Sequence, residues 1–280
     1  MLIVESQSLD VHRNLAIEEY LMVHAASEGP VLFLWRSDCA VVMGKNQNPW
    51  RECRLDLMAA DNVPLARRIS GGGTVYHDAG NLNYCIIVDR RDYQEQQAYD
   101  LVIQALEPFG IRAERTGRSN LSMDGLKFSG NAFCFRGGRA LHHGTLLLDA
   151  DLARLNRYLG AVMDGIETHA IASVPAPVGN LQLDGAALSA MLIEQFRNRY
   201  GGGDPVRLTE EELDSQVLGA LIRHQLSDAW RYGATPRFVL QHDGLRLEIV
   251  RNIVVGAQGR HDAKTLIDKH FSEIAFSLLC

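Results

Sequence analysis

A run of three glycines inside strand-like sequence places the tightest constraint on how this chain can fold. Gly71, Gly72 and Gly73 interrupt an otherwise β-rich stretch, although a turn needs only one glycine. Because the triplet removes every Cβ from one patch of main chain, its amide N–H groups can approach a ligand closely and point at negative charge. We therefore expect a ligand-binding loop here, with a flexible hairpin as the alternative.

Polar side chains flank the glycines on both sides. Guanidinium groups bind carboxylates and phosphates, and neutral imidazole and amide groups donate or accept hydrogen bonds. Together they predict a site for the anionic end of a substrate. The residues concerned are Arg67, Arg68 and Ser70 before the glycines, and His77, Asn81 and Asn83 after them.

Composition limits the partners of the chain. Its 280 residues, 46% of them hydrophobic, can form one large domain or one domain plus a small one. The formal charge of −6 provides no basic field, so we expect neither a nucleic acid nor a membrane as partner. The N-terminus resembles no targeting segment and no apolar run reaches spanning length, which predicts a cytoplasmic protein. Five scattered cysteines indicate reduced thiols.

Hydrophobic periodicity predicts an α/β (α+β) fold. We expect helices over residues 14–26, with Glu18 and Glu19 on the wetter side, and over 93–109, and short strands over 31–35, 39–43 and 82–88. Asp124-Gly125 and Gly137-Gly138 are typical of hairpin turns. Helices interspersed with hairpins favour a mixed, largely antiparallel sheet flanked by helices.

The glycine-rich segment 201–205 is the best predicted domain boundary. It divides the chain into residues 1–200 and a unit of residues 201–280, which comprises a linker helix and a small α+β element. Thr209 and Glu212 form a capping-box pattern that predicts a helix running to residue 224. Leu266 and Phe271 belong to the apolar side of an expected final helix.

Several motifs resemble the lipoate–protein ligase family of the biotin/lipoate ligase superfamily. The run from Arg67 to Tyr84 resembles the family's Arg-Arg-x-Ser-Gly-Gly-Gly loop with its following segment. Motifs beginning at Gly117, Lys127 and His142 then follow in the family's order. The resemblance covers most of residues 1–200 and implies a biotin/lipoate-ligase-like catalytic domain followed by a short accessory domain.

The resemblance implies an ATP-dependent lipoate–protein ligase. Such an enzyme converts lipoate, or octanoate, to an acyl-AMP and transfers the acyl group to a specific lysine. Activation is needed because hydroxide is a poor leaving group, and the mixed anhydride must be kept from water. ATP and Mg²⁺ are the implied cofactors and lipoate the substrate. The implied partners are apo-lipoyl-domain proteins, namely 2-oxoacid dehydrogenase acyltransferase subunits and the glycine-cleavage H protein or a relative; a separate accessory subunit is a further option.

Residue roles follow from this chemistry and from the motifs. The amides of the three glycines, with Arg68, can surround carboxylate and phosphate oxygens. Lys127 can bridge a carboxyl oxygen and the α-phosphate as a compact cation, and it is the expected catalytic residue. No third ligand accompanies His77, His142 and His143 at a metal-site spacing, so we expect no protein metal cage. The other expected substrate- or adenylate-binding residues are Ser70, His77, Asn81, Asn120, His143, Gly144 and Thr145.

Two departures from the family pattern affect these expectations. Asn120 stands where the family carries an aspartate that could assist Mg²⁺, so any Mg²⁺ near Asn120 would be held differently. In the segment that resembles the adenylate-covering loop, Pro175, Ala176 and Pro177 replace positions where relatives carry arginines. We therefore expect fewer phosphate contacts from this loop.

Other activities of the superfamily remain as alternatives. An octanoyl or lipoyl transferase uses a cysteine thioester, yet no cysteine stands near Gly117–Asn120 or just beyond Asp151, and Cys85 and Cys134 are typical of buried strand thiols. A non-catalytic lipoate-binding regulator would have no need of Lys127. Biotin–protein ligases carry a Gly-Arg-Gly-Arg-x-Gly loop that is absent here.

Overall fold

The computed structural model describes residues 1–25, 29–201, 206–261 and 263–278. The chain forms two compact units whose segments alternate along the sequence. The first unit comprises Met1–Cys39, His77–Leu152 and Pro175–Arg223, and the second comprises Ala40–Tyr76, Ala153–Val174 and His224–Cys280. Residues 202–205 of the predicted boundary lie outside the described residues, and the division at residue 200 stays a prediction.

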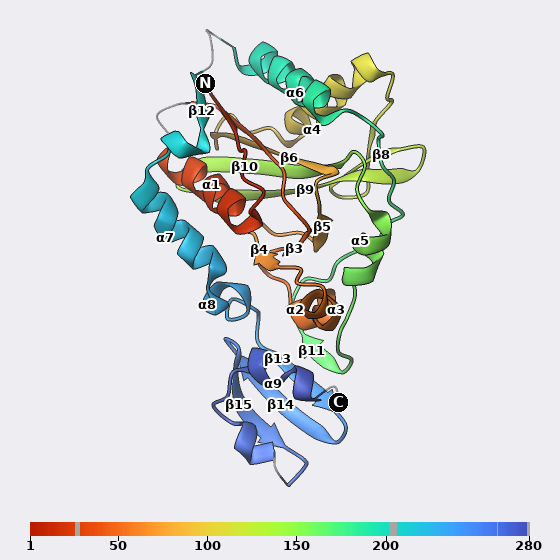
Figure 1. The fold of residues 1–280 in the computed structure, drawn as a ribbon, viewed down its shortest axis with the longest axis vertical. Helices are drawn as coiled ribbons and strands as arrows, with labels where there is room; N and C mark the ends of the chain where they lie inside the picture. Colours follow the sequence, from red (N-terminus) through yellow and green to blue (C-terminus); the bar gives the residue numbers. More distant parts are fainter. Residues whose placement is uncertain (26–28, 202–205, 262, 279–280) are drawn as a thin grey trace. The chain divides into compact units, whose positions relative to one another are not determined.

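The first unit is built on an eight-stranded sheet (Figure 1). The two pairings that involve β1 are parallel and the others are antiparallel, which confirms the mixed, largely antiparallel sheet. In spatial order the strands are β12 (Val206–Thr209), β1 (Leu2–Glu5), β2 (Val31–Trp35), β6 (Asn81–Asp89), β10 (Arg139–Leu147), β9 (Leu126–Arg136), β8 (Asn120–Met123) and β7 (Glu114–Thr116).

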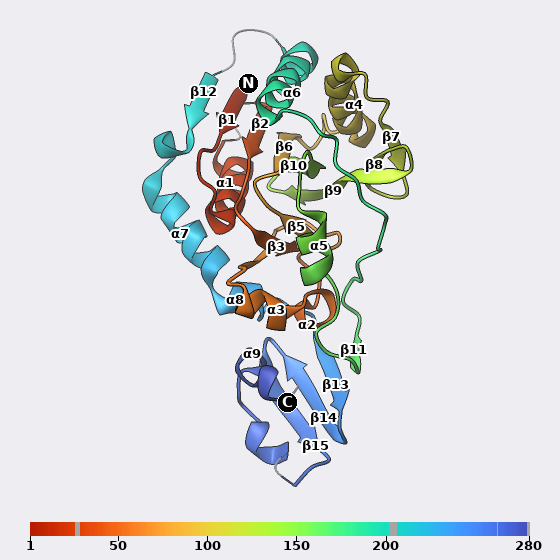
Figure 2. The same ribbon diagram turned by 45° about the vertical axis from the view of Figure 1, so that its right-hand side comes forward.

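Helices cover both faces of this sheet. Helix α1 (Val11–His24) packs on β2, β6 and β10, while α4 (Glu95–Leu106) and α6 (Gly185–Tyr200) pack side by side over the opposite face (Figure 2). The central strand β6 is buried along eight consecutive residues for this reason. Alternate β6 side chains, including Tyr84 and Ile86, enter the core with α4 and α6, so their neighbours Asn83 and Cys85 face α1.

The prediction for α1 was wrong in two respects. The helix begins at Val11, because the Asp10 carboxylate accepts hydrogen bonds from the amides of His12 and Arg13 as an N-cap. Glu18 and Glu19 are buried, not on a wetter side. Periodicity cannot reveal such burial when the acidic side chains pair within the sheet face beneath the helix.

Several local predictions in the first unit are confirmed. Residues 95–109 form α4 and a 3₁₀ turn, η2 (Glu107–Phe109), and Gly110 follows with a φ of 74°. Asp124-Gly125 joins β8 to β9 with positive φ at both residues, and Gly137-Gly138 joins β9 to β10 in the same way.

The second unit contains two small sheets and short helices. β4 (Leu65–Arg67), β3 (Ala40–Met43) and β5 (Val75–His77) form one sheet, near α2 (Pro49–Glu52) and α3 (Leu55–Ala60). The other is an antiparallel sheet of β11 (Ile166–Thr168), β13 (Phe238–His242), β14 (Leu245–Val250) and β15 (Ile253–Gln258). α5 (Leu152–Tyr158) begins at the end of the first unit's middle segment.

Aromatic packing joins the C-terminal sheet to α2 within the second unit. Trp50 is fully buried, with ring centroids 5.4 Å from Phe238 and 4.8 Å from Phe271. Such pairs contribute about 0.5–1.5 kcal/mol beyond the area that they bury. The C-terminal sheet therefore shares its core with residues 40–76.

Two predicted helices of the tail differ from the structure. Thr209 ends strand β12 and Glu212 ends a 3₁₀ turn, η3 (Glu210–Glu212), so the helix, α7 (Ser215–Leu226), begins later, where Asp214 accepts from two backbone amides. The expected final helix is divided into η4 (Ala263–Leu266), α9 (Phe271–Ile274) and η5 (Phe276–Leu278). The divide occurs where Asp268 and Lys269 hydrogen-bond to Val254 of β15. A further short helix, α8 (Asp228–Arg231), follows α7.

Candidate active site

The glycine loop connects β4 to β5 in the second unit and is shaped by Arg68. Its guanidinium Nη2 donates to the carbonyls of Gly71 and Gly73, both at 2.7 Å, and Nε donates to Ser70 Oγ at 3.0 Å. The side chain is buried. Arg68 therefore gathers the loop's carbonyl oxygens on one side and adds positive charge beneath them, instead of extending toward solvent.

The glycine amides are available for a ligand. Among the described residues, the N–H groups of Gly71, Gly72 and Gly73 have no hydrogen-bond acceptor. Gly72 has a φ of 86°, which favours glycine, and a Cβ on Gly44 would lie 2.3 Å from the Gly72 carbonyl oxygen. The loop thus combines donor groups without partners and a close main-chain approach, as an anion-binding site requires.

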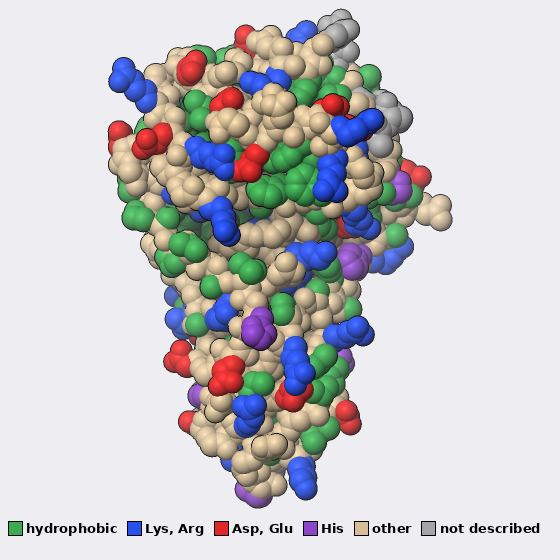
Figure 3. Space-filling view, turned by 180° about the vertical axis from the view of Figure 1, so that it is seen from behind, with side chains coloured by type: hydrophobic (Ala, Val, Ile, Leu, Met, Phe, Trp, Pro, Cys, Tyr) green, Lys and Arg blue, Asp and Glu red, His purple; other side chains and the backbone are tan. Residues whose placement is uncertain are grey.

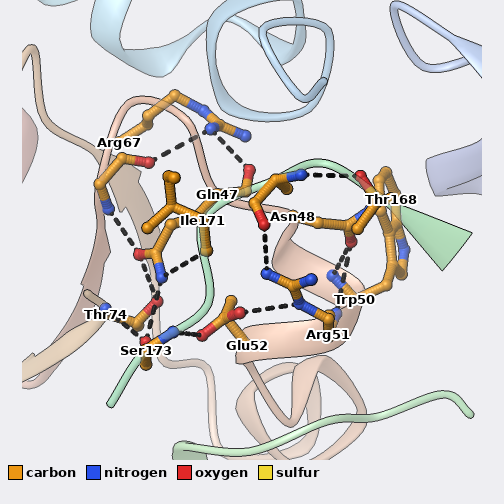
Figure 4. Close-up of polar contacts among 12 residues, drawn as sticks. Gln47, Asn48, Trp50, Arg51, Glu52, Arg67, Thr74, Thr168, Ile171 and Ser173 are labelled. Carbon is orange, nitrogen blue, oxygen red and sulfur yellow. Dashed lines mark hydrogen bonds and ion pairs between the residues drawn. The ribbon is translucent and has the colours of Figure 1, made fainter. Parts of the chain in front are cut away.

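A polar network fixes the end of this loop (Figure 4). Ser173 Oγ accepts from the Thr74 amide at 2.9 Å and from Gln47 Nε2 at 3.0 Å. The Ser173 amide donates to Glu52 Oε2 at 3.0 Å. Gln47 Oε1 in turn accepts from the Gly44 amide and from Thr74 Oγ1, at 2.9 and 2.8 Å. Three hydrogen bonds therefore hold Ser173 in place, and one of them is to Thr74 at the end of the loop.

The first arginine of the motif has a structural role. Arg67 is fully buried, and its guanidinium donates to the carbonyls of Lys45, Gln47 and Arg231 and to Thr235 Oγ1. Burial lowers the pKa of Arg67 to about 10. Its partners connect β4 with the turn after α8, so Arg67 binds the glycine-loop strand to the C-terminal part of the second unit.

Lys127 lies on β9 in the first unit, beside a β-bulge. The β8–β9 register passes from Ser129 to Lys127 and leaves Phe128 as the additional residue. Phe128 enters the core, and Ser129 Oγ hydrogen-bonds Asn131 Nδ2 on the same side of the sheet at 3.1 Å. Lys127 consequently returns to the opposite face, where Nζ lies 3.0 Å from the position that a Cβ on Gly130 would occupy.

Main-chain contacts hold Lys127 from the other side. Its amide donates to the Pro177 carbonyl at 2.9 Å, and its carbonyl accepts from the Gly179 amide at 3.0 Å. Val178 pairs with it in an isolated parallel bridge. The segment whose prolines depart from the family pattern therefore serves as a short extra strand that positions the lysine.

The sheet face under α1 carries a second polar group. His143 Nδ1 lies 2.7 Å from Glu18 Oε2, and Trp35 Nε1 donates to the other oxygen, Oε1, at 3.1 Å. The Trp35 ring is also 5.4 Å from the buried ring of His77. On the same face Thr145 Oγ1 accepts from the Gly130 amide at 3.3 Å. Thr145, Gly130 and Lys127 are thereby neighbours.

Gly144 and His142 point to the opposite face, under α4. A Cβ on Gly144 would lie 2.5 Å from Asn131 Oδ1 and 2.8 Å from Tyr84, and these two side chains hydrogen-bond each other. His142 Nε2 lies 3.1 Å from the same Asn131 oxygen and Nδ1 lies 3.0 Å from Tyr93 Oη. Burial lowers the pKa of His142 to about 3, so the ring is neutral. This is a packing arrangement.

The predicted asparagines occupy different settings. Asn81 is fully buried; its Nδ2 donates to Asn83 Oδ1 at 3.0 Å, while its Oδ1 has no partner among the described residues. Asn120 is half-buried and pairs with Gly130 across β8 and β9. The unpartnered oxygen of Asn81 could accept a hydrogen bond from a ligand, whereas Asn120 shows no such signal.

The cysteines and the potential metal ligands were the other candidates for chemistry. Cys85 is buried, which raises its thiol pKa well above the usual value, and Cys134 is half-buried on β9. The described residues contain no group of three or more His, Cys, Asp or Glu side chains able to hold a metal ion.

Within the same residues, no helix is long and apolar enough to cross a membrane. Charges of both signs are interspersed on the face shown in Figure 3.

Three contributors escaped sequence reasoning: Glu18, Gln47 and Ser173. Glu18 looked like an ordinary surface position of an amphipathic helix. Gln47 and Ser173 hydrogen-bond across 126 positions of sequence, so no local pattern could connect them. For Gln47 and Ser173, the only signal in the sequence was that each lies inside a segment that resembles a family motif.

Known proteins resemble this chain over most of its length. Residues 10–200 match the family described as the lipoyl protein ligase A/B catalytic domain. Lipoate-protein ligase A of Psychrobacter cryohalolentis is 39% identical over 237 residues, which cover 80% of this chain and 70% of that protein. The human mitochondrial lipoyl amidotransferase LIPT1 is 36% identical over 249 residues, covering 85% of this chain and 66% of that protein.

Solved structures share the fold. The crystal structure of P. falciparum LipL1 in complex with lipoate superposes with a TM-score of 0.72 at 24% identity, covering 96% of this chain and 90% of that one. A lipoate-protein ligase A bound with ATP has a TM-score of 0.67 at 22% identity and covers 83% of this chain and 98% of that one. At these identities the likeness concerns the fold alone.

Proposed function

Because this chain belongs to the lipoyl protein ligase A/B catalytic domain family, we propose that it is an ATP-dependent lipoate–protein ligase. It activates lipoate to lipoyl-AMP with release of pyrophosphate, and then forms an amide bond between the lipoyl group and an acceptor lysine with release of AMP. Octanoate is a second candidate substrate. The observation that carries the proposal is the glycine loop, whose amides lack partners while Arg68 engages its carbonyls.

The glycine loop would bind the anionic groups. Donors that are already oriented stabilise charge without reorganising when it develops. Arg68 keeps the Gly71 and Gly73 carbonyl dipoles turned toward itself, so the amides meet the carboxylate and phosphate oxygens. Arg68 therefore acts through the loop, which refines the expectation that it touches the substrate.

Lys127 would supply the compact cation. The backbone of Lys127 is fixed by the β-bulge and by main-chain hydrogen bonds to Pro177 and Gly179. The ammonium group is therefore preorganised. It would bridge the substrate carboxyl oxygen and the α-phosphate, and offset the negative charge that accumulates during attack on phosphorus. Thr145 and Gly130 are the neighbours that define the space around it.

Mg²⁺ would accompany ATP through its phosphates. Mg²⁺ retains waters and needs only one or two protein carboxylates beside phosphate oxygens. Asn120 offers a side-chain carbonyl oxygen where the family pattern has a carboxylate, and this oxygen is the only contribution to Mg²⁺ binding that we propose for it. The acceptor would be an apo-lipoyl domain: one solved structure of the same fold is that of a bi-partite lipoate protein ligase and its E2 lipoyl domain from Thermoplasma acidophilum. A cytoplasmic location stays a prediction.

A transferase is the second candidate function. Its support is the 36% identity to the human lipoyl amidotransferase. It would take the acyl group from a carrier or donor protein and need no ATP.

One assay distinguishes the two functions. The purified protein is incubated with an apo-lipoyl domain and either lipoate, ATP and Mg²⁺, or octanoyl-carrier protein without ATP, and the acceptor mass is measured. If the protein is a ligase, the acceptor gains mass only with ATP, and pyrophosphate is released only when lipoate is present. Acylation from the carrier without ATP, blocked when the thiols of Cys85 or Cys134 are replaced, would establish the transferase instead.

A further inference from the structure

Ser173 carries a hydroxyl proton that the contacts of the second unit leave unused. A hydroxyl group has two lone pairs and one O–H donor. Both lone pairs of Ser173 Oγ are engaged, because the Thr74 amide and Gln47 Nε2 donate to it. The orientation of the Gln47 amide is determined, since its Oε1 must accept from the Gly44 amide. The O–H of Ser173 must therefore point elsewhere.

No acceptor for that proton is present among the described residues. Gln47 Oε1 already accepts two hydrogen bonds, and Glu52 Oε2 is engaged by the Ser173 amide. Ser173 Oγ lies 3.2 Å from the position that a Cβ on Gly73 would occupy. The unused donor thus adjoins the partner-free amide of Gly73.

We infer that the Ser173 hydroxyl is a further donor of the anion site and binds, with the glycine amides, a carboxylate or phosphate oxygen of the substrate. The inference rests on the proposed function only for the identity of that anion. Two hydrogen bonds to Ser173 Oγ and one from the Ser173 amide to Glu52 position the hydroxyl group, so the donor loses little conformational entropy when a ligand binds. Arg68 supplies the positive charge of the site.

Charged and neutral forms of the same ligand test this role. Isothermal titration calorimetry with lipoate and lipoamide, and with AMP and adenosine, compares ligands that differ only in the anionic group. Ser173→Ala should weaken the charged member of one pair roughly 10- to 100-fold, the range for a hydrogen bond to an ion, and leave its neutral member unchanged. The pair that responds identifies the carboxylate or the phosphate. Ser173→Thr, which keeps the hydroxyl, should restore the affinity.

A matched control and an independent anion complete the test. Ser272→Ala removes another hydrogen-bonded hydroxyl of the second unit, which contacts Asn252, and should alter no affinity. Equal weakening of charged and neutral ligands by Ser173→Ala, or no weakening, would overturn the inference in favour of a structural role. If the wild type binds inorganic pyrophosphate with dependence on Ser173 but neither lipoate nor ATP, the proposed function fails and the inference stands. Absence of any anion binding by the wild type refutes the inference.

Discussion

His143 Nδ1 lies 2.7 Å from Glu18 Oε2 across the buried contact between β10 and α1. Because Trp35 Nε1 holds the other carboxylate oxygen, the carboxylate joins three elements of the first unit and fixes the orientation of the imidazole ring. A buried acid with both oxygens engaged is costly to disturb, since its partners would lose an acceptor in a dry environment.

Glu18→Ala should therefore destabilise the protein strongly. It leaves Trp35 Nε1 and His143 Nδ1 without this acceptor, at a cost of about 1–3 kcal/mol for each. Glu19→Ala is the matched control: Glu19 is also buried, but its partner Arg136 is 55% exposed, so water can solvate the guanidinium that the substitution releases and the loss should be smaller. Urea denaturation of both variants measures the difference. Equal losses would mean that the Glu18 contacts carry no special weight.

Lys127→Ala should slow lipoyl-AMP formation roughly 10²–10³-fold while the fold persists, because that is the usual cost of removing one preorganised charge donor. Gly130→Ala probes the same ammonium indirectly: the new Cβ would lie 3.0 Å from Lys127 Nζ and displace it. We expect a lower rate with a change in unfolding free energy below about 1 kcal/mol. Pyrophosphate release and thermal unfolding measure the two effects. Near-normal turnover of Lys127→Ala would refute its assigned role.

Gly144→Ala should lower the stability of the protein, whereas Gly130→Ala should mainly lower the reaction rate. Its Cβ would meet Asn131 Oδ1 at 2.5 Å and Tyr84 at 2.8 Å, both in a buried cluster that cannot yield easily. Overpacking of this kind costs about 1–3 kcal/mol. Calorimetry should show a lower Tm. An unchanged Tm would indicate that the cluster under α4 is loosely packed.

Stability should fall in acid because of His142. Burial holds the pKa of this ring at about 3, below its ordinary value of 6.5. Between those values the unfolded chain binds the proton and the folded chain does not, so stability decreases as pH falls below roughly 6.5, by about 1.4 kcal/mol per pH unit. Urea titrations from pH 7 to 4 test this. His142→Gln should show a shallower dependence, and an unchanged slope would contradict the assignment.

A chain ending at Tyr200 should lose the folded second unit. It lacks the Arg231 carbonyl and Thr235 hydroxyl that bind the buried Arg67 guanidinium, and the rings that cover Trp50. Removing the partners of a buried charge costs about 3–5 kcal/mol. Trp50→Phe in the full chain keeps an aromatic ring and serves as the milder comparison. Limited proteolysis should cut residues 40–76 of the truncated chain first; protection equal to that of the full chain would refute the expectation.

Local structure was largely predictable. Strands β2 and β6 and helix α4 were evident because their patterns depend on residues within a few positions of one another. The secondary structure of residues 201–280 was harder to predict. A capping box at Thr209 and Glu212 competed with pairing of β12 to β1, and the long-range pairing prevailed.

The sequence by itself determined the chemistry available: a bare glycine loop, a lysine in Leu126-Lys127-Phe128, and a reduced set of arginines near Pro175. Only the tertiary structure decided where these groups point. Simple alternation would place Lys127 on the face of Ser129, but the bulge at Phe128 reverses it, because burial of Phe128 in the core outweighs regular pairing. Bulges, and contacts such as Ser173 with Thr74, depend on partners distant in sequence, which no local pattern encodes.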